Sequence, residues 1–302
     1  PFLFLKGPWP LLSLFFPLFG FFIIFVSLFG MRTWFAIGQK KGISYNATGR
    51  LLPKKNGKPV EGKAKVVIAG HLDSAFQMPI TRFGDNVFKI AVPGLLYLIL
   101  LMIFGLVKTL ILAFGEPVVL WQNAWLMITW LDVMFIVFSF VGLPAFYILI
   151  SGLIGGTPVM GANDNLSGVG LAMSIGKYFA DPNHQLENVE VWIGGFGSEE
   201  CGERGAEAFV KKYGDQGLLD NAQAVIPDSA GGGERLAIIC HEKMHFAKHD
   251  IGVCNRLLQA YHKWVKEDEI ANPISIEGPK PLPFAASDAG RFSLKGDRKS
   301  VV

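Results

Sequence analysis

The stretch Lys65–Ser74, KVVIAGHLDS, is a run of β-branched and small apolar residues that ends in a histidine and an acid. Such a run predicts a buried strand whose polar residues lie just beyond its carboxyl end. The same order recurs where Val189–Gly195 leads to Ser198-Glu199-Glu200 and where Ala222–Pro227 leads to Asp228-Ser229. Because ligands gather beyond the carboxyl ends of the strands in α/β sheets, these polar residues form a candidate site.

Helical patterns alternate with these strands along the chain. The predicted helices are 167–180, 204–213 and 251–266, and the further predicted strands are 236–240 and 274–276. Strands that alternate with helices predict an α/β fold, built on a mixed, mostly parallel sheet with helices on both faces.

Other parts of the chain are unusually apolar. Of the 302 residues, 51% are hydrophobic and 18% are charged, whereas soluble domains carry about 25% charge. Three stretches carry no charged residue: 7–31, 90–107 and 133–155. The second continues from Thr109 to Gly115 beyond Lys108. Each is long enough to cross a bilayer, so we expect about three transmembrane helices and a lipid bilayer as a partner.

These stretches divide the chain into four parts. We expect an N-terminal transmembrane segment at 1–31, the first part of a polar domain at 32–89, an inserted transmembrane hairpin at 90–155 and the remainder of the polar domain at 156–302. Within the hairpin, 117–131 carries Trp121, Trp125 and Trp130. Tryptophan favours the lipid–water interface, so this segment is predicted to be a surface connector.

The distribution of charge predicts the orientation in the membrane. Residues 32–65 carry nine Lys or Arg against one acid, Glu61, and the hairpin tip at 115–123 has neither Lys nor Arg. By the positive-inside rule, we expect an integral membrane protein whose polar domain faces the cytoplasm. There Cys201, Cys240 and Cys254 would remain free thiols. The net charge of +3 gives no basic field, so nucleic acid is not an expected partner.

The residues at the strand ends have the chemistry of metal ligands. One imidazole, of His71, together with several carboxylates, from Asp164, Asp228 and the Glu199-Glu200 pair, suits zinc, or alternatively manganese or cobalt. One carboxylate can bridge two ions. Of the adjacent Glu199 and Glu200, one can bind metal while the other accepts a proton from water. Each acid alone also has a structural interpretation, since acids cap turns and helix starts.

Four motifs together carry a resemblance to a known family. They are Gly70–Ser74 (GHLDS), Gly161–Gly168 (GANDNLSG), Ser198–Gly202 (SEECG) with Gly205-Ala206, and Ile226–Asp228 (IPD). They resemble the successive motifs of the di-zinc aminopeptidase family, metallopeptidase family twenty-eight, which includes bacterial leucyl aminopeptidases, glutamate carboxypeptidases and glutaminyl cyclases. The resemblance covers most of 64–296 apart from the hairpin. It implies the phosphorylase/hydrolase-like fold of zinc exopeptidases.

The resemblance also implies a role for each site residue. His71 and Asp228 would bind one zinc ion, Asp164 would bridge two zinc ions, Glu200 would bind the second, Glu199 would be the general base, and Asp73 would hold the His71 ring. The implied protein is a membrane-anchored, zinc-dependent exopeptidase, an aminopeptidase that hydrolyses N-terminal peptide bonds of peptide substrates through a metal-bridged water. The Asp164–Asn165 peptide bond is expected to be cis.

Two departures from the family pattern raise an alternative. The family joins its first two motifs by a short segment, whereas here the hairpin lies between them. The family's last zinc ligand is a histidine after a segment like Ser287–Ser293, but no histidine follows His262 in this chain. We therefore expect a sequence truncated at its C-terminus, in which the second zinc site lacks its usual histidine. A catalytically inactive, peptidase-like membrane scaffold is the alternative.

A second motif predicts a different metal site. His241-Glu242-Lys243-Met244-His245 matches H-E-x-x-H. On a helix, His241 and His245 would share one face and bind zinc, with Glu242 as the base. The second alternative is therefore a zincin-type protease.

Overall fold

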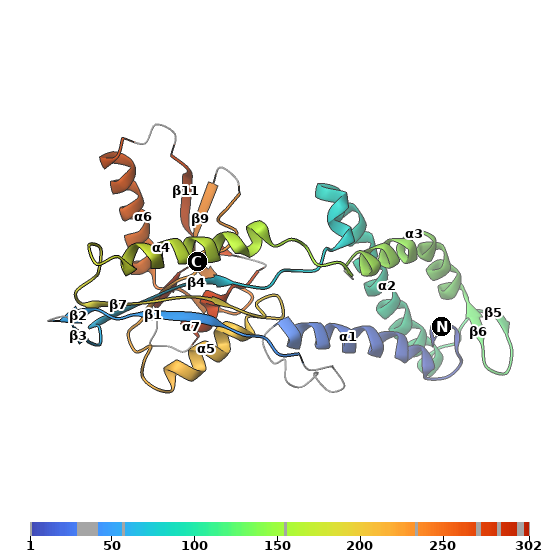
Figure 1. Ribbon diagram of the computed structural model, residues 1–302. Coiled ribbons are helices and arrows are strands. Elements are labelled where there is room, and N and C mark those ends of the chain that lie inside the picture. The colour runs from blue at the N-terminus through green and yellow to red at the C-terminus, as the bar shows by residue number, and fades with distance from the viewer. Residues whose placement is uncertain are drawn as a thin grey trace. The chain divides into compact units, whose positions relative to one another are not determined.

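A computed structural model describes residues 2–28, 42–55, 58–153, 156–232, 235–269, 273–282, 285–294 and 299–301 (Figure 1). Arg32, Lys40 and Lys41, three of the basic residues on which the predicted orientation depends, lie outside the described residues. The chain forms two compact units. We call Pro1–Phe35 with Phe76–Pro158 the helical unit, and Ala36–Ala75 with Val159–Val302 the sheet unit.

The sheet unit is built on a five-stranded sheet with the order β1-β7-β4-β8-β12. The strands are β1 (Ala47–Leu51), β4 (Ala64–His71), β7 (Val189–Phe196), β8 (Gln223–Val225) and β12 (Lys299–Val301). β4 runs parallel to β7 and β8, and β1 is an antiparallel edge strand on β7. The predicted mixed, mostly parallel sheet is confirmed.

Helices cover both faces of this sheet. They include α4 (Ser167–Ala180), α5 (Arg204–Gly214) and α7 (Asp288–Ser293). Side chains alternate between the faces of a strand. Val67 of β4 therefore packs in one core, with Phe209 of α5 and Phe292 of α7, while the next residue, Ile68, packs in another with Ala172 of α4. The predicted covering of both faces is confirmed.

A second, three-stranded sheet in this unit has the order β10-β9-β11. Its strands are β9 (Arg235–Glu242), β10 (Ala247–Lys248) and β11 (Ser275–Leu282), and α6 (Ile251–Glu267) packs on it. β9 and β11 run parallel and both extend beyond the predicted strands. A short hairpin of β2 (Lys54–Lys55) and β3 (Lys58–Pro59) completes the unit.

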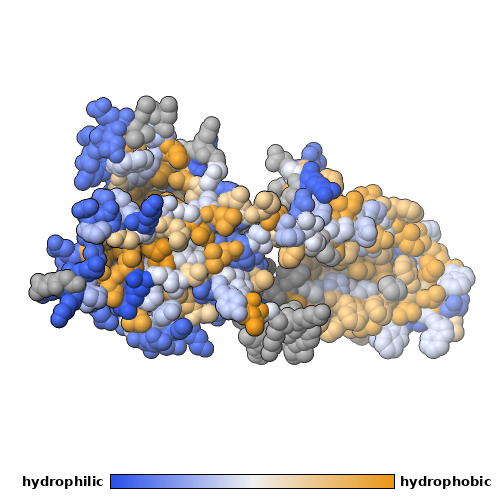
Figure 2. Space-filling view, viewed as in Figure 1, coloured by the Kyte–Doolittle hydropathy of each residue, from blue (hydrophilic) through white to orange (hydrophobic). Residues whose placement is uncertain are grey.

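The helical unit contains three apolar helices: α1 (Leu12–Leu28), α2 (Val87–Phe114) and α3 (Trp130–Leu153). Shorter elements in it are η1 (Phe2–Phe4), η2 (Trp9–Leu11), η4 (Pro79–Asn86), β5 (Val119–Gln122) and β6 (Met127–Thr129). Figure 2 shows hydrophobic side chains gathered over these helices. The predicted surface connector is a β5–β6 hairpin in which Trp121 and Trp125 are exposed, and Trp130, also exposed, begins α3.

Two of the three predicted spans are long and apolar enough to cross a membrane among the described residues. They are Lys89–Phe114 and Trp130–Gly152. Only 11% of the most apolar segment of the first helix and 17% of that of the second is buried. The apolar stretch Trp9–Ile23 is shorter than a full span. By length and composition, α2 and α3 could therefore each cross a membrane.

A buried ion pair joins the two long helices. The ammonium group of Lys108 in α2 donates to Oδ2 of Asp132 in α3 and to the carbonyl oxygen of Met127, each at 2.7 Å. The backbone N–H and hydroxyl of Thr129 donate to the same carboxylate oxygen at 2.7 and 2.8 Å. Because a buried charge is stable only when it is paired and hydrogen-bonded, these contacts explain how Lys108 is accommodated in an otherwise apolar helix.

Candidate metal centre

The imidazole of His71 lies where several acids meet. His71 is the last residue of β4, and its side chain is 2% exposed. Its Nε2 atom lies 2.9 Å from a carboxylate oxygen of Asp164, 3.9 Å from one of Asp228 and 4.0 Å from one of Glu199. These acids come from three separate segments of the chain, and the folded sheet unit brings them together beside the carboxyl end of β4.

Three of the candidate ligands have the spacing of a metal site. Ligand atoms of His71, Asp164 and Glu200 all lie within 4.8 Å of one another, and Asp228 lies beside them. An imidazole nitrogen with carboxylate oxygens is a donor set that zinc accepts. The residues present therefore fit a zinc ion.

The loop before α4 presents Asp164. A left-handed Gly161 (φ 64°) begins it, and a Cβ atom there would lie 2.8 Å from the Cβ of Ser74. The Asp164–Asn165 peptide bond is cis, as predicted. The buried amide of Asn165 donates to the carbonyl oxygen of Pro227 at 3.0 Å and accepts from the N–H of Gly168 at 2.9 Å. Asn165 therefore fastens the Asp164 loop to the residue before Asp228, a contact that we did not predict.

Asp73 makes different contacts from those expected. Its backbone carbonyl oxygen, rather than its carboxylate, lies 2.9 Å from Nδ1 of His71, while the nearest carboxylate oxygen is 3.7 Å from that nitrogen. The carboxylate instead accepts the backbone N–H groups of Glu199 at 3.0 Å and Glu200 at 3.1 Å. The expected hydrogen bond to the ring is made by the backbone of Asp73 rather than by its carboxylate. Asp73 joins β4 to the loop that carries both glutamates.

Burial and neighbouring acids perturb the carboxyl groups of the site. Burial, together with the charges of Asp288, Glu203 and other acids, raises the pKa of Glu199 to about 9. Burial also raises the pKa of Glu200 and that of Asp228, in part offset by His71. Carboxyl groups crowded in this way favour either protons or a bound cation.

Asp288 is a further acid that we did not predict for the site. It begins α7 and is buried, and its two carboxylate oxygens have no hydrogen-bond partner among the described residues. Burial and the nearby carboxylates of Glu203 and Asp228 raise its pKa well above the ordinary value. The sequence signal that could have indicated Asp288 is its place in Ser287–Ser293 (SDAGRFS). This stretch resembles the family's segment before the last zinc ligand.

The predicted zincin site is wrong. His241 and Glu242 are the last residues of strand β9, and His245 follows in a turn, so the two histidines share no helix face. The carboxylate of Glu242 is buried, lies 3.1 Å from Nε2 of His249 and accepts the N–H of Ser287 at 3.2 Å. The pairing of β9 with β11 extends the strand through the motif and overrides the helical interpretation.

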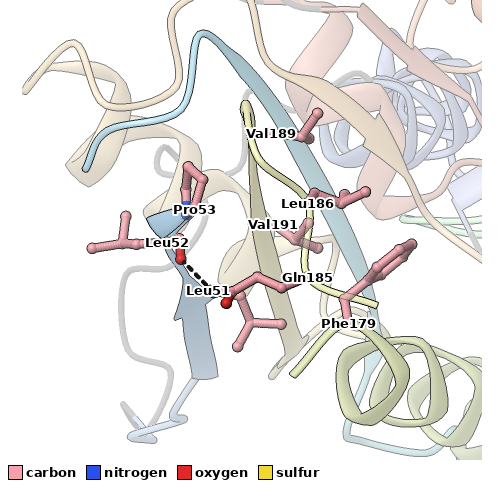
Figure 3. A pocket seen from close by; sticks show the side chains of 8 residues that line it. All are labelled: Leu51, Leu52, Pro53, Phe179, Gln185, Leu186, Val189 and Val191. Carbon is pink, nitrogen blue, oxygen red and sulfur yellow. Dashed lines mark hydrogen bonds between the residues drawn. The ribbon is translucent and has the colours of Figure 1, made fainter. Parts of the chain in front are cut away.

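A small apolar hollow lies at the opposite end of the sheet, at the start of β7 (Figure 3). Its lining residues are Leu51, Leu52, Pro53, Phe179, Gln185, Leu186, Val189 and Val191. Its volume of about 10 Å³ has room for roughly one water molecule. The amide of Gln185 closes it by donating to the carbonyl oxygen of Leu52 at 3.2 Å. The hollow is therefore a packing feature rather than a ligand site.

Comparison with known proteins gives one family. The model of peptidase family M28 matches residues 146–282, a range that includes Asp164, Glu199, Glu200 and Asp228 but not His71. The match covers less than half of the chain. It agrees with the predicted family and with the predicted class, a metallopeptidase. No curated protein gives a significant match.

Solved structures show only a distant likeness. LapB from Legionella pneumophila has 10% identity and a TM-score of 0.42, covering 98% of this chain and 55% of that one. The dodecamer PhTET1-12s has 16% identity and a TM-score of 0.33, covering 53% and 50%. The TET aminopeptidase of Thaumarchaeota archaeon SCGC AB-539-E09 has 11% identity and a TM-score of 0.41, covering 93% and 87%. This chain spans about half the length of the first two.

Proposed function

Since the model of peptidase family M28 matches residues 146–282, we propose that this chain is a membrane-anchored, zinc-dependent exopeptidase, and specifically an aminopeptidase that hydrolyses N-terminal peptide bonds. The observation that carries the proposal is the approach of Asp164, Glu199 and Asp228 to Nε2 of a single buried histidine. Carboxylates from separate segments that crowd around one imidazole repel one another, and a bound cation would relieve that repulsion.

The residues that would hold zinc are His71, Asp164, Glu200 and Asp228. Zinc, when bound, lowers the pKa of a water molecule and polarises the carbonyl group of the scissile bond. The resemblance implies two ions, and Asp164 would be a ligand of both. The chain's own contribution is to fix the donors: Asn165 fastens the loop of Asp164, and the carbonyl oxygen of Asp73 orients the ring of His71.

Glu199 would be the general base. Its carboxyl group is 12% exposed and lies 4.0 Å from Nε2 of His71. Without a metal, the pKa of about 9 keeps Glu199 protonated at neutral pH. A bound cation would lower this pKa, and the resulting carboxylate could take a proton from the attacking water and return it to the leaving amine. The N–H groups of Glu199 and Glu200 both bind Asp73, so one contact sets the position of the base and of the adjacent ligand.

The membrane part of the proposal depends on composition. α2 and α3 are exposed, apolar and of spanning length, and they interrupt the sheet unit between β4 and α4. We propose that they form a hairpin in a lipid bilayer, that 1–31 adds a further anchor and that the sheet unit faces the cytoplasm. The basic composition of 32–65 supports this orientation. Recovery of the protein in the membrane fraction after alkaline carbonate washing would test the anchoring.

A second candidate function is a peptidase-like scaffold without activity. The specific observation in its favour is the α2–α3 hairpin between His71 and Asp164, where the resemblance implies a short segment. The two candidates differ in a direct experiment with detergent-solubilised protein, stripped of metal and then titrated with zinc.

An aminopeptidase should bind zinc in stoichiometric amounts and release 4-nitroaniline from amino-acid anilides. It should not cleave the matched N-acetylated anilides, because these lack a free amino group. Stoichiometric zinc without any hydrolysis would favour the scaffold over the enzyme. Absence of zinc binding would contradict the metal centre itself.

A further inference from the structure

α7 is firmly attached to the rest of the sheet unit. Phe292 is fully buried, with its ring centroid 6.1 Å from that of Phe196 and 6.2 Å from that of Phe209. At the start of the helix, the N–H of Ser287 donates to Glu242, whose carboxylate is also paired with His249. The helix is therefore fixed both to the main sheet and to β9.

Arg291 extends from this helix to the loop that follows β7. Its Nη2 atom lies 2.6 Å from a carboxylate oxygen of Glu203 and donates to the carbonyl oxygen of Gly202 at 3.3 Å. The side chains of Arg291 and Glu203 are only 12% and 6% exposed. A charge-assisted contact at this burial is among the stronger hydrogen bonds in proteins and is little screened by salt.

The same two loop residues hold the backbone of Glu199. The N–H groups of Gly202 and Glu203 donate to the carbonyl oxygen of Glu199, the latter at 2.7 Å. Ser198 and Glu203 have φ angles of 59° and 51°. Non-glycine residues avoid this region, so the turn needs contacts from outside to keep its shape.

The loop is thus held from two sides. Asp73 accepts the N–H groups of Glu199 and Glu200 on one side, and Arg291 binds Gly202 and Glu203 on the other. We propose that Arg291 is a positioning residue, which acts through Glu203 to fix the carboxyl groups of Glu199 and Glu200. This inference rests on the proposed function, because it assigns to these two carboxyl groups the roles of base and metal ligand.

The chemistry of the pair explains why an arginine stands here. Loss of the guanidinium would leave the buried carboxylate of Glu203 with His245 as a remaining basic neighbour, at 3.5 Å, beside the acids of the site. A lysine would keep the charge, and because both contacts come from the one atom Nη2, it could retain part of them. A double variant that removes both charges would also remove the carboxylate charge while still lacking the hydrogen bond to Gly202.

The experiment compares Arg291→Met, Arg291→Lys, Glu203→Gln and the double variant Arg291→Met/Glu203→Gln in the full chain. Arg235→Met is the matched control, since Arg235 is 77% exposed and pairs with Glu277 at 3.5 Å on the second sheet. Hydrogen exchange of peptides covering 198–205 and 64–71, zinc affinity, and kcat and KM for an amino-acid anilide are measured for each variant.

Arg291→Met should speed exchange in 198–205 but not in 64–71, and should weaken zinc affinity about 10- to 100-fold, as for other residues that orient metal ligands. It should lower kcat more than it raises KM. Arg291→Lys should have exchange, zinc affinity and kcat between those of Arg291→Met and the parent. The double variant should recover part of the zinc affinity, and Arg235→Met should match the parent in all three measurements.

Exchange and zinc affinity equal to those of the parent in Arg291→Met would overturn the inference. So would an equal increase of exchange in 64–71, which indicates a merely structural role. If Arg291→Met does not fold, the same comparison is decided by Arg291→Lys and Glu203→Gln. If the parent itself neither binds zinc nor hydrolyses the substrate, the proposed function fails, while the exchange of 198–205 still decides whether Arg291 positions the loop.

Discussion

The Nε2 atom of His71 lies 2.9 Å from a carboxylate oxygen of Asp164, although the whole α2–α3 hairpin separates the two residues in the chain. The sheet unit brings the flanks of this insertion together. The N–H of Val159 donates to the carbonyl oxygen of Ala75 at 3.0 Å, and the hydroxyl of Ser74 donates to the carbonyl oxygen of Val159 at 3.0 Å. An insertion whose ends are joined in this way adds little to the entropy of loop closure, so the site tolerates it.

Glu199→Gln should abolish most of the peptidase activity and leave zinc binding intact. The amide keeps the size of the side chain but cannot accept a proton, and general bases contribute roughly 10²- to 10⁴-fold to the rate. We expect a fall of about that size in kcat on amino-acid anilides, with the zinc content unchanged. The exposed Glu187→Gln is the control. Retention of full activity in Glu199→Gln would show that another group is the base.

His71→Ala should eliminate zinc binding, whereas His241→Ala should not. His71 is the imidazole of the acid cluster, while His241 lies at the end of strand β9. Zinc content after dialysis and isothermal titration of the metal-free protein measure the difference. Loss of zinc binding in His241→Ala but not in His71→Ala would show that the H-E-x-x-H motif binds zinc despite its strand conformation.

The metal-free protein should become less stable as the pH rises. The pKa of Glu199 lies at about 9, against an ordinary value of 4.5. The folded chain therefore holds a proton that the unfolded chain releases, and this stabilisation is complete below about pH 4.5 and is lost as the pH rises through about 9. The raised pKa of Glu200 and of Asp228 acts in the same direction.

The expected result is a Tm that decreases between pH 5 and pH 9 in the presence of a chelator. The decrease should be smaller in Glu199→Gln, because the amide does not ionise. Added zinc should raise the Tm most at high pH, where the carboxyl groups have lost their protons. A Tm that increases with pH in the chelated protein would contradict the assigned direction of the pKa shift.

The elements around the site were predictable because their signal is local. Residues 65–70 and 189–195 are apolar runs that belong to buried strands, and they lie within β4 and β7. The predicted helix at 167–180 has the bounds of α4. The acids that follow these runs could be assigned to one edge of the sheet, since parallel strands end together.

The contacts that hold the acids could not be predicted in the same way. β1 has the polar sequence ATGRL, and its attachment includes a buried pair of Arg50 with Glu190 at 2.6 Å, far away in the chain. The preference of the Asp73 carboxylate for two backbone N–H groups depends on how β4 and β7 align. The strand conformation of His241 depends on pairing with β11. Each of these is set by tertiary contacts rather than by local pattern.

Lys108→Met should destabilise the helical unit, whereas Lys108→Met/Asp132→Leu should not. The single variant leaves Asp132, which is fully buried, without its cation. Breaking a buried ion pair in this way costs about 3–5 kcal/mol, while replacing both charges by apolar residues is often neutral or stabilising.

The loss of helical circular dichroism with increasing sodium dodecyl sulfate measures the effect in detergent-solubilised protein. The exposed Lys89→Met is the control, since it removes a lysine from the same helix without breaking a buried pair. Unfolding of Lys108→Met at the same detergent ratio as this control would mean that the pair contributes little. Equal destabilisation of the single and double variants would mean that the hydrogen bonds of Thr129 and Met127, rather than the balance of charge, hold α2 and α3 together.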